Sequence, residues 1–174
     1  MRRTAHAAIA VLLLMSSSLA QTAGWRAATP SELASVVPSR ASVVGERIET
    51  EARTASGIVD THGRFVAGVV LITAGYSAEG KYSHYLTVQV PIEIGDVFLK
   101  PGEYVFGWDR MNAQDSLSIH FNEAATGKQI GIATARRIPG SSRVESLRIW
   151  PPTEKSVVQI GRFGLSYRIP GNRR

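Results

Sequence analysis

The stretch that decides the fold runs from residue 84 to residue 108 and reads HYLTVQVPIEIGDVFLKPGEYVFGW. Leu86, Val88 and Val90 alternate with more polar residues, which is the period-two pattern of a half-buried β-strand. Pro91 cannot donate a hydrogen bond to a β-ladder, so it ends this strand or lies at a sheet edge. The stretch therefore predicts short strands separated by proline and glycine.

The same pattern extends to both sides of this stretch. Pro101 and Gly102 are typical of a type II turn between a strand at 94–99 and one at 103–108. Residues 65–73 are apolar on both alternations, which predicts a central strand covered on both faces. A strand is also predicted at 46–54, where the content of Glu, Arg and Ala leaves a helix as the alternative, and a hairpin that turns at Gly63 is predicted at 57–66. Further strands are predicted at 116–122, 128–135, 143–150, 156–160 and 162–169. The fold class is therefore all-β, an antiparallel β-sandwich or barrel-like sheet of about 8–10 short strands with a short N-terminal helix.

The first 20 residues are typical of a secretory signal peptide. Arg2 and Arg3 supply the positive charge, residues 7–15 (AAIAVLLLM) form an apolar run, and Ser18-Leu19-Ala20 offers small residues for cleavage after Ala20. The apolar run is about half as long as the roughly 20 residues of a membrane-spanning helix. We therefore expect a soluble protein that is exported to the periplasm or the extracellular space, with no transmembrane segment after signal removal.

The mature chain divides into a short leader and one β domain. Within the leader, residues 21–45, Thr29-Pro30-Ser31-Glu32 matches a capping box with proline at the first helical position. This predicts a helix from Pro30 to Val37, which Pro38 stops. Residues 46–174 are predicted to form the single β domain.

The composition excludes several kinds of chemistry. The chain has no cysteine, so disulfides, cysteine-ligated metals and a thiol nucleophile are all excluded. A nucleophile elbow needs a glycine two residues after its serine, and after Ser77 that position is Glu79. Thr126-Gly127-Lys128 is not a phosphate-binding loop, because Asn122 and Gln129 stand where that loop needs Gly and Ser or Thr. The sequence thus predicts no catalytic residue, no metal ligand, no cofactor and no specific nucleic-acid motif.

Basic residues are concentrated in the second part of the chain. Residues 110–174 carry 11 basic and 4 acidic side chains, a balance of +7, and most of the bases are arginines. Arg148, Arg162 and Arg168 fall on the outward alternation of the last strands, so together they are candidate ligand-binding residues. Their partners would be anionic envelope polymers. The alternative is that these arginines lie on a strand face that is exposed to water and binds no ligand.

His84 is the other candidate ligand-binding residue. It shares its alternation with Leu86 and Val88, so it is expected to point inward near a strand end. His62 and His120 lie on other segments, without the close ligand spacing of a metal site.

The chain also resembles a small group of uncharacterised exported bacterial β-rich proteins. The residues that carry the resemblance are Leu99–Tyr104 (LKPGEY), Thr54–Gly57, Gly68–Gly75 and Ile160–Phe163. The resemblance implies a β fold and export, and it implies no activity. We therefore expect a non-enzymatic binding or structural module of the cell envelope. The alternative is a small periplasmic enzyme or metal-binding protein that uses His84.

Overall fold

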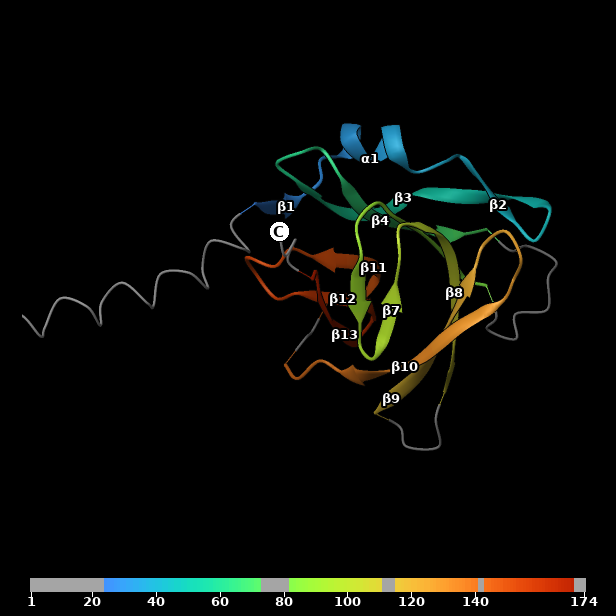
Figure 1. Cartoon of the computed structure of the whole chain (residues 1–174). Helices are drawn as coiled ribbons and strands as arrows, with labels where there is room; N and C mark the ends of the chain where they lie inside the picture. The colour runs from blue at the N-terminus through green and yellow to red at the C-terminus, as the bar shows by residue number, and fades with distance from the viewer. Residues whose placement is uncertain (1–23, 73–81, 111–114, 141–142, 171–174) are drawn as a thin grey trace, which may run out of the picture.

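The computed structural model describes residues 24–72, 82–110, 115–140 and 143–170 (Figure 1). Within these ranges the chain forms one short helix and thirteen strands, and ten of the strands form an antiparallel, nearly closed barrel. The predicted all-β class, in its barrel-like form, is therefore confirmed. The predicted signal peptide, residues 1–20, lies outside the described residues.

Thirteen strands and one helix follow one another along the described part of the chain. They are β1 (Trp25–Ala27), α1 (Pro30–Val36), β2 (Arg40–Val43), β3 (Glu46–Asp60), β4 (Phe65–Leu71), β5 (His84–Val88), β6 (Ile92–Ile94), β7 (Val97–Leu99), β8 (Gly102–Arg110), β9 (Ser116–Glu123), β10 (Gln129–Arg137), β11 (Glu145–Trp150), β12 (Val157–Gly161) and β13 (Phe163–Arg168). The barrel runs β1-β3-β4-β5-β8-β9-β10-β13-β12-β11, with β2 paired to β3 and the β6–β7 hairpin paired to β13.

The N-terminal helix forms for the local reason that the sequence predicts. The Thr29 hydroxyl accepts a hydrogen bond from the Glu32 amide at 3.3 Å, and the Glu32 carboxylate accepts one from the Thr29 amide at 2.8 Å. This reciprocal capping box satisfies two of the free N–H groups at the start of α1. The helix ends at Val36, and Leu33 is buried, so α1 docks on β3 and β4.

The structure differs from the predicted segments in three places. The leader is part of the sheet, because β1 and β2 both pair with β3. β3 is one long strand, where the sequence predicts a strand at 46–54 and a separate hairpin at 57–66, and its register with β4 shifts between Glu51 and Ser56. The strand expected at 94–99 is instead the tight β6–β7 hairpin, which turns at Gly95 with φ of 57°.

The predicted type II turn at Pro101–Gly102 is wrong. Such a turn needs a positive φ at its glycine, and Gly102 is not among the residues with positive φ. β7 pairs with β6, whereas β8 pairs with β5 and β9, so residues 100–101 only connect two parts of the sheet. The Pro-Gly pattern reflects only local residues. The pairing of the two flanking strands depends on other strands, because β7 pairs with β6 and β8 pairs with β5 and β9.

The core occupies the inside of the barrel. Its largest fully buried side chains are Phe106, Phe121, Ile58, Leu86, Ile92, Ile94, Leu99, Ile119, Ile149 and Leu165. A second, smaller cluster lies on the outer side of the barrel. It includes Val69 on β4, Tyr85 on β5 and Val105 on β8, whose side chains point outward and pack against residues of the β2–β3 hairpin. Figure 1 shows α1 and this hairpin along the upper side of the barrel. The expectation that residues 65–73 are covered on both faces is confirmed for β4.

The barrel closes at a seam where β11 lies against β3 and β4. Between the described residues of β11 and β3 there is no backbone ladder. A side chain replaces it, because the Ile149 amide donates to the Ser56 hydroxyl at 2.9 Å in a buried position. The close approach is allowed by Gly68, where an added Cβ would lie 2.9 Å from Leu147. This seam places β11, with its one basic residue Arg148, beside β3 and β4.

Candidate functional site

His84, the predicted inward-facing histidine, belongs to the seam. It is 4% exposed, and its ring stacks on Phe106 with centroids 4.7 Å apart. Nε2 lies 3.1 Å from the Ser146 carbonyl oxygen on β11, and Nδ1 lies 2.8 Å from the Ser83 hydroxyl. The geometry fits a neutral imidazole that donates from Nε2 to Ser146 and accepts at Nδ1 from Ser83.

Burial lowers the pKa of His84 from 6.5 to about 4, and the hydrogen bond to the Ser146 carbonyl only partly opposes this. The ring is therefore neutral at neutral pH. Both nitrogens already have partners, so neither is free to hold a ligand. His84 joins β5 to β11 and so acts as part of the barrel closure.

Arg168 and Arg162 lie at opposite ends of β13. The Arg168 guanidinium forms a two-point ion pair with the Glu93 carboxylate, at 2.6 and 2.8 Å, so its charge is compensated. Arg162 lies in the turn between β12 and β13, where its carbonyl accepts from the Ile138 amide. A six-residue strand separates the two by roughly 20 Å. The structure therefore does not bring Arg162 and Arg168 together.

Arg148 lies in a different setting, against an aromatic ring. Its guanidinium carbon is 4.6 Å from the centroid of the Trp150 ring, and the Lys155 ammonium is 4.1 Å from the same centroid. We call Arg148, Trp150 and Lys155 the Trp150 cluster. Cation–π attraction holds each charge on the ring while leaving its N–H groups able to donate elsewhere.

The indole of Trp150 is fixed in place from beneath. Its Nε1–H donates to the Gln159 side-chain oxygen at 2.9 Å. Gln159 is buried although it lies on the outward alternation of β12, and its amide nitrogen donates to the carbonyls of Arg143 and Gly161. The ring on which both cations rest is therefore oriented by a satisfied hydrogen-bond chain.

The loop at 151–156 returns Lys155 to the ring. Its two ends are pinned by Tyr167, whose hydroxyl donates to the Trp150 carbonyl at 2.6 Å and whose amide donates to the Ser156 carbonyl at 2.9 Å. Burial raises the pKa of Tyr167, so its hydroxyl stays protonated. Ser156 has a φ of 51°, which costs a residue with a Cβ about 1–2 kcal/mol. The loop thus keeps a strained conformation at the position next to Lys155.

The cations of the Trp150 cluster have no carboxylate partner among the residues that the structure describes. Neither Arg148 nor Lys155 forms an ion pair with a carboxylate of the described residues. Glu154 is adjacent to Lys155 in the sequence, yet its carboxylate also makes no ion pair within those residues. Both cations rest on one ring, so they lie within roughly 9 Å of each other, about the Debye length of physiological salt. Their potentials therefore add at the surface.

The strand register adds Arg136 to the same outer surface. Arg148 is opposite Gln159, Gln159 is opposite Gly164, and Gly164 is opposite Arg136. Arg136 is exposed and has no acidic partner in the described part of the chain. We call Arg136, Arg148 and Lys155 the basic face. Of the three predicted arginines, only Arg148 belongs to it.

Sequence reasoning missed Trp150 and Lys155. The available signal was the pair of prolines at 151 and 152, because a tight turn after a strand can bring a nearby side chain back onto that strand. The sequence does not indicate that Lys155, among the loop residues, would meet the ring. That contact depends on the Tyr167 hydrogen bonds from a strand later in the chain.

Among the described residues, no three His, Asp or Glu side chains gather where they could hold a metal ion. No helix in the same ranges is long and apolar enough to cross a membrane. No protein-family model, no curated protein and no solved structure matches the chain. The resemblance to exported β-rich proteins therefore stays a prediction.

Proposed function

We propose that the protein is an exported, non-enzymatic binding module of the cell envelope that holds anionic polymers on its basic face. The observation that carries this proposal is the Trp150 cluster, in which two cations share one fixed ring and have no carboxylate partner in the described part of the chain. Export rests on the sequence of residues 1–20 alone.

The chemistry of the basic face suits phosphate, sulfate and carboxylate groups. A guanidinium that stacks on a ring exposes its donors at its edge, and these match the paired oxygens of such anions. Lys155 adds a compact point charge, and Arg136 extends the positive surface by roughly 14 Å across three strand spacings. A chain of repeated anionic groups can bind along this row, whereas a single small anion meets only one part of it.

The alternative, a small periplasmic enzyme or metal-binding protein that uses His84, has no support from the geometry. The two ring nitrogens of His84 are hydrogen-bonded to Ser83 and Ser146, and the ring is buried against Phe106. A substrate or metal ion could reach it only after the seam opened.

The test is heparin binding at low and at physiological salt. Wild type should bind at low salt and lose most of its affinity at physiological salt, because the binding releases counterions. The variant Arg148→Gln/Lys155→Gln should bind more than tenfold more weakly at low salt.

A charge-matched control is Arg53→Gln/Arg168→Gln, which also removes two positive charges. Both of these arginines are exposed and paired, with Glu51 and Glu93 respectively. This control should bind heparin nearly as well as wild type. No binding by wild type at low salt, or an equal loss in the two double variants, would overturn the proposal.

A further inference from the structure

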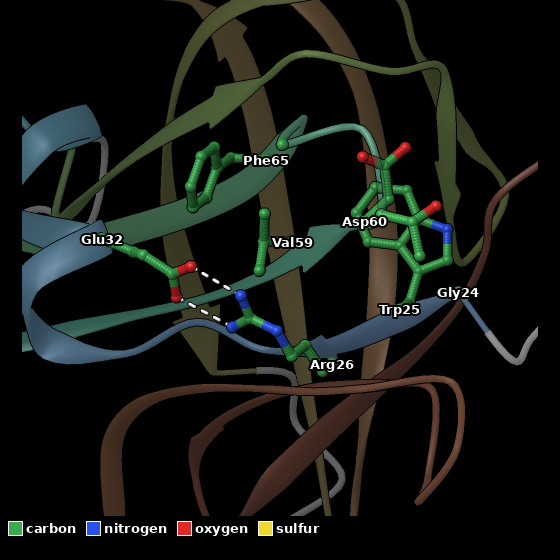
Figure 2. Close-up of a pocket in the computed structure, with 9 residues that line it drawn as sticks. Gly24, Trp25, Arg26, Glu32, Val59, Asp60 and Phe65 are labelled. Atoms are coloured by element: carbon green, nitrogen blue, oxygen red, sulfur yellow. Dashed lines mark hydrogen bonds and ion pairs between the residues drawn. The ribbon is translucent and has the colours of Figure 1, made fainter.

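A pocket of about 430 Å³ lies on the other side of the seam, between α1 and the strands β1, β3 and β4 (Figure 2). This volume falls in the range of sites for small molecules, roughly 300–1,000 Å³. The lining residues are Gly24, Trp25, Arg26, Glu32, Val59, Asp60, Thr61, Gly63 and Phe65. The proposed polymer-binding surface uses none of them.

The shape of the pocket follows from strand register. Arg26 on β1 is opposite Val59 on β3, and Val59 is opposite Phe65 on β4. Two strand spacings separate Arg26 from Phe65, roughly 10 Å between their backbones. Figure 2 shows the two side chains on either side of Val59. The pocket is therefore a slot with Val59 as its floor, an aromatic ring as one wall and a guanidinium as the other.

The polar wall is a hydrogen-bonded ion pair. The two terminal nitrogens of Arg26 donate to the two carboxylate oxygens of Glu32, at 2.8 and 2.6 Å. Glu32 also accepts from the amide and the hydroxyl of Thr29 at the start of α1. The hydrogen bond from Arg26 and then those from Thr29 lower the pKa of Glu32 to about 2, so the pair stays ionised. A planar ion pair that offers both donors and acceptors thus faces Val59.

The pocket carries no net charge, in contrast to the basic face. Arg26 is balanced by Glu32, and Asp60 is balanced by the Arg64 guanidinium at 2.7 Å. Burial alone would raise the pKa of Asp60, but hydrogen bonds from the Arg64 amide and guanidinium and the His62 amide hold it below its usual value. An anionic ligand would therefore gain little here, and a neutral one would need only hydrogen bonds and apolar contact.

We propose that this pocket binds a neutral pyranose sugar unit. A pyranose has an apolar face of C–H groups, which can lie against the Phe65 ring and the Val59 side chain. Its hydroxyls both donate and accept, and so match the Arg26–Glu32 pair and the Thr61 hydroxyl at the rim. A flat aromatic ligand would use the Phe65 wall but would leave the polar wall without hydrogen bonds.

The experiment is an NMR titration of the full mature chain with three probes: methyl glucoside, N-acetylglucosamine and glucuronic acid. At millimolar concentration one of the neutral sugars should shift the Val59 methyl signals and the Trp25 indole signal saturably. Glucuronic acid should bind no more tightly than the better neutral sugar, because the pocket has no spare positive charge.

Two variants separate the pocket from the rest of the molecule. Phe65→Ala should weaken the neutral sugar more than tenfold. Phe98→Ala, which removes a ring that is 49% exposed and outside the pocket, should leave its affinity unchanged. If Phe65→Ala fails to fold, Arg26→Gln supplies the test, since Arg26 is largely exposed, and it should weaken the sugar severalfold.

The proposal is overturned if no neutral sugar shifts the Val59 methyl signals, or if Phe65→Ala and Phe98→Ala affect the sugar equally. It is also overturned if indole, added as a flat aromatic probe, saturates these signals while all three sugars leave them unchanged.

Discussion

Arg26 and Arg148 occupy neighbouring regions of one barrel, yet they have opposite surroundings. Arg26 is locked to Glu32 by two hydrogen bonds, and the nearby Asp60 is locked to Arg64. Arg148 rests on Trp150 with Lys155 on the same ring and no carboxylate partner within the described residues. The difference shows that partner residues, and not strand alternation, decide whether the charge of an arginine is compensated.

This comparison separates stability from binding. Variants on the pocket side should change the free energy of unfolding and leave polyanion affinity unchanged. Variants of the Trp150 cluster should weaken polyanion binding and leave the free energy of unfolding nearly unchanged. The seam connects the two regions, so it should affect both.

The largest expected effect is on the seam, through protonation of His84. In the unfolded chain His84 takes up a proton below its ordinary pKa of 6.5, whereas in the folded chain it does so only near a pKa of about 4. Acid therefore favours the unfolded chain. The contribution is retained above pH 6.5 and is lost as pH falls towards 4, by about 3 kcal/mol in total. Urea melts between these pH values measure it.

The control for this loss is the double variant His62→Gln/His120→Gln, which removes the other two histidines of the described residues. It should keep the same slope of stability against pH between 6.5 and 4.5. A flat profile in wild type over this window, or a slope that disappears in the double variant, would show that His84 is not the titrating group.

The next effect is expected at the pocket, from Asp60→Ala. This carboxylate accepts from the amides of His62 and Arg64 and from the Arg64 guanidinium, and its side chain is 5% exposed. Losing these charge-assisted hydrogen bonds should cost about 2–3 kcal/mol. Asp109→Ala, at a side chain that is 63% exposed, should cost less than about 0.5 kcal/mol. Equal costs in denaturant melts would contradict the account.

The smallest effect on stability should come from the Trp150 cluster itself. Arg148→Gln/Lys155→Gln removes two cation–π contacts at an accessible site, which should cost at most about 1 kcal/mol. Thermal melts of this variant and wild type should therefore nearly coincide. A large drop in the midpoint would mean that the two cations support the loop at 151–156, and that weaker heparin binding by the variant reflects damage to the fold.

The parts of this molecule that were predictable are those set by local residue patterns. Period-two alternation in β5 and β8 predicts strands, and the spacing of Thr29 and Glu32 predicts the start of α1. The inward position of His84 also follows from alternation. Each of these depends on residues within one element, where propensity and pattern act directly.

The rest depends on pairs that are distant in the sequence. His84 bonds to Ser146, 62 residues away, and Arg168 pairs with Glu93, 75 residues away. Ser56 completes the seam with Ile149, 93 residues away. Alternation predicts that a side chain points outward, but it does not indicate the partner it meets. For this reason the alternation predicts Arg148, Arg162 and Arg168 as one site, whereas only Arg148 belongs to the basic face.

The most direct test of the basic face follows the indole N–H signals of the three tryptophans during one NMR titration with a heparin oligosaccharide at low salt. Trp150 contacts Arg148 and Lys155 of the basic face, Trp25 lines the pocket, and Trp108 packs against the core. The account predicts that the Trp150 signal shifts saturably, that added salt reverses the shift, and that Trp25 and Trp108 stay in place. A Trp150 signal that does not shift, or a larger shift of the Trp25 signal, would contradict the account.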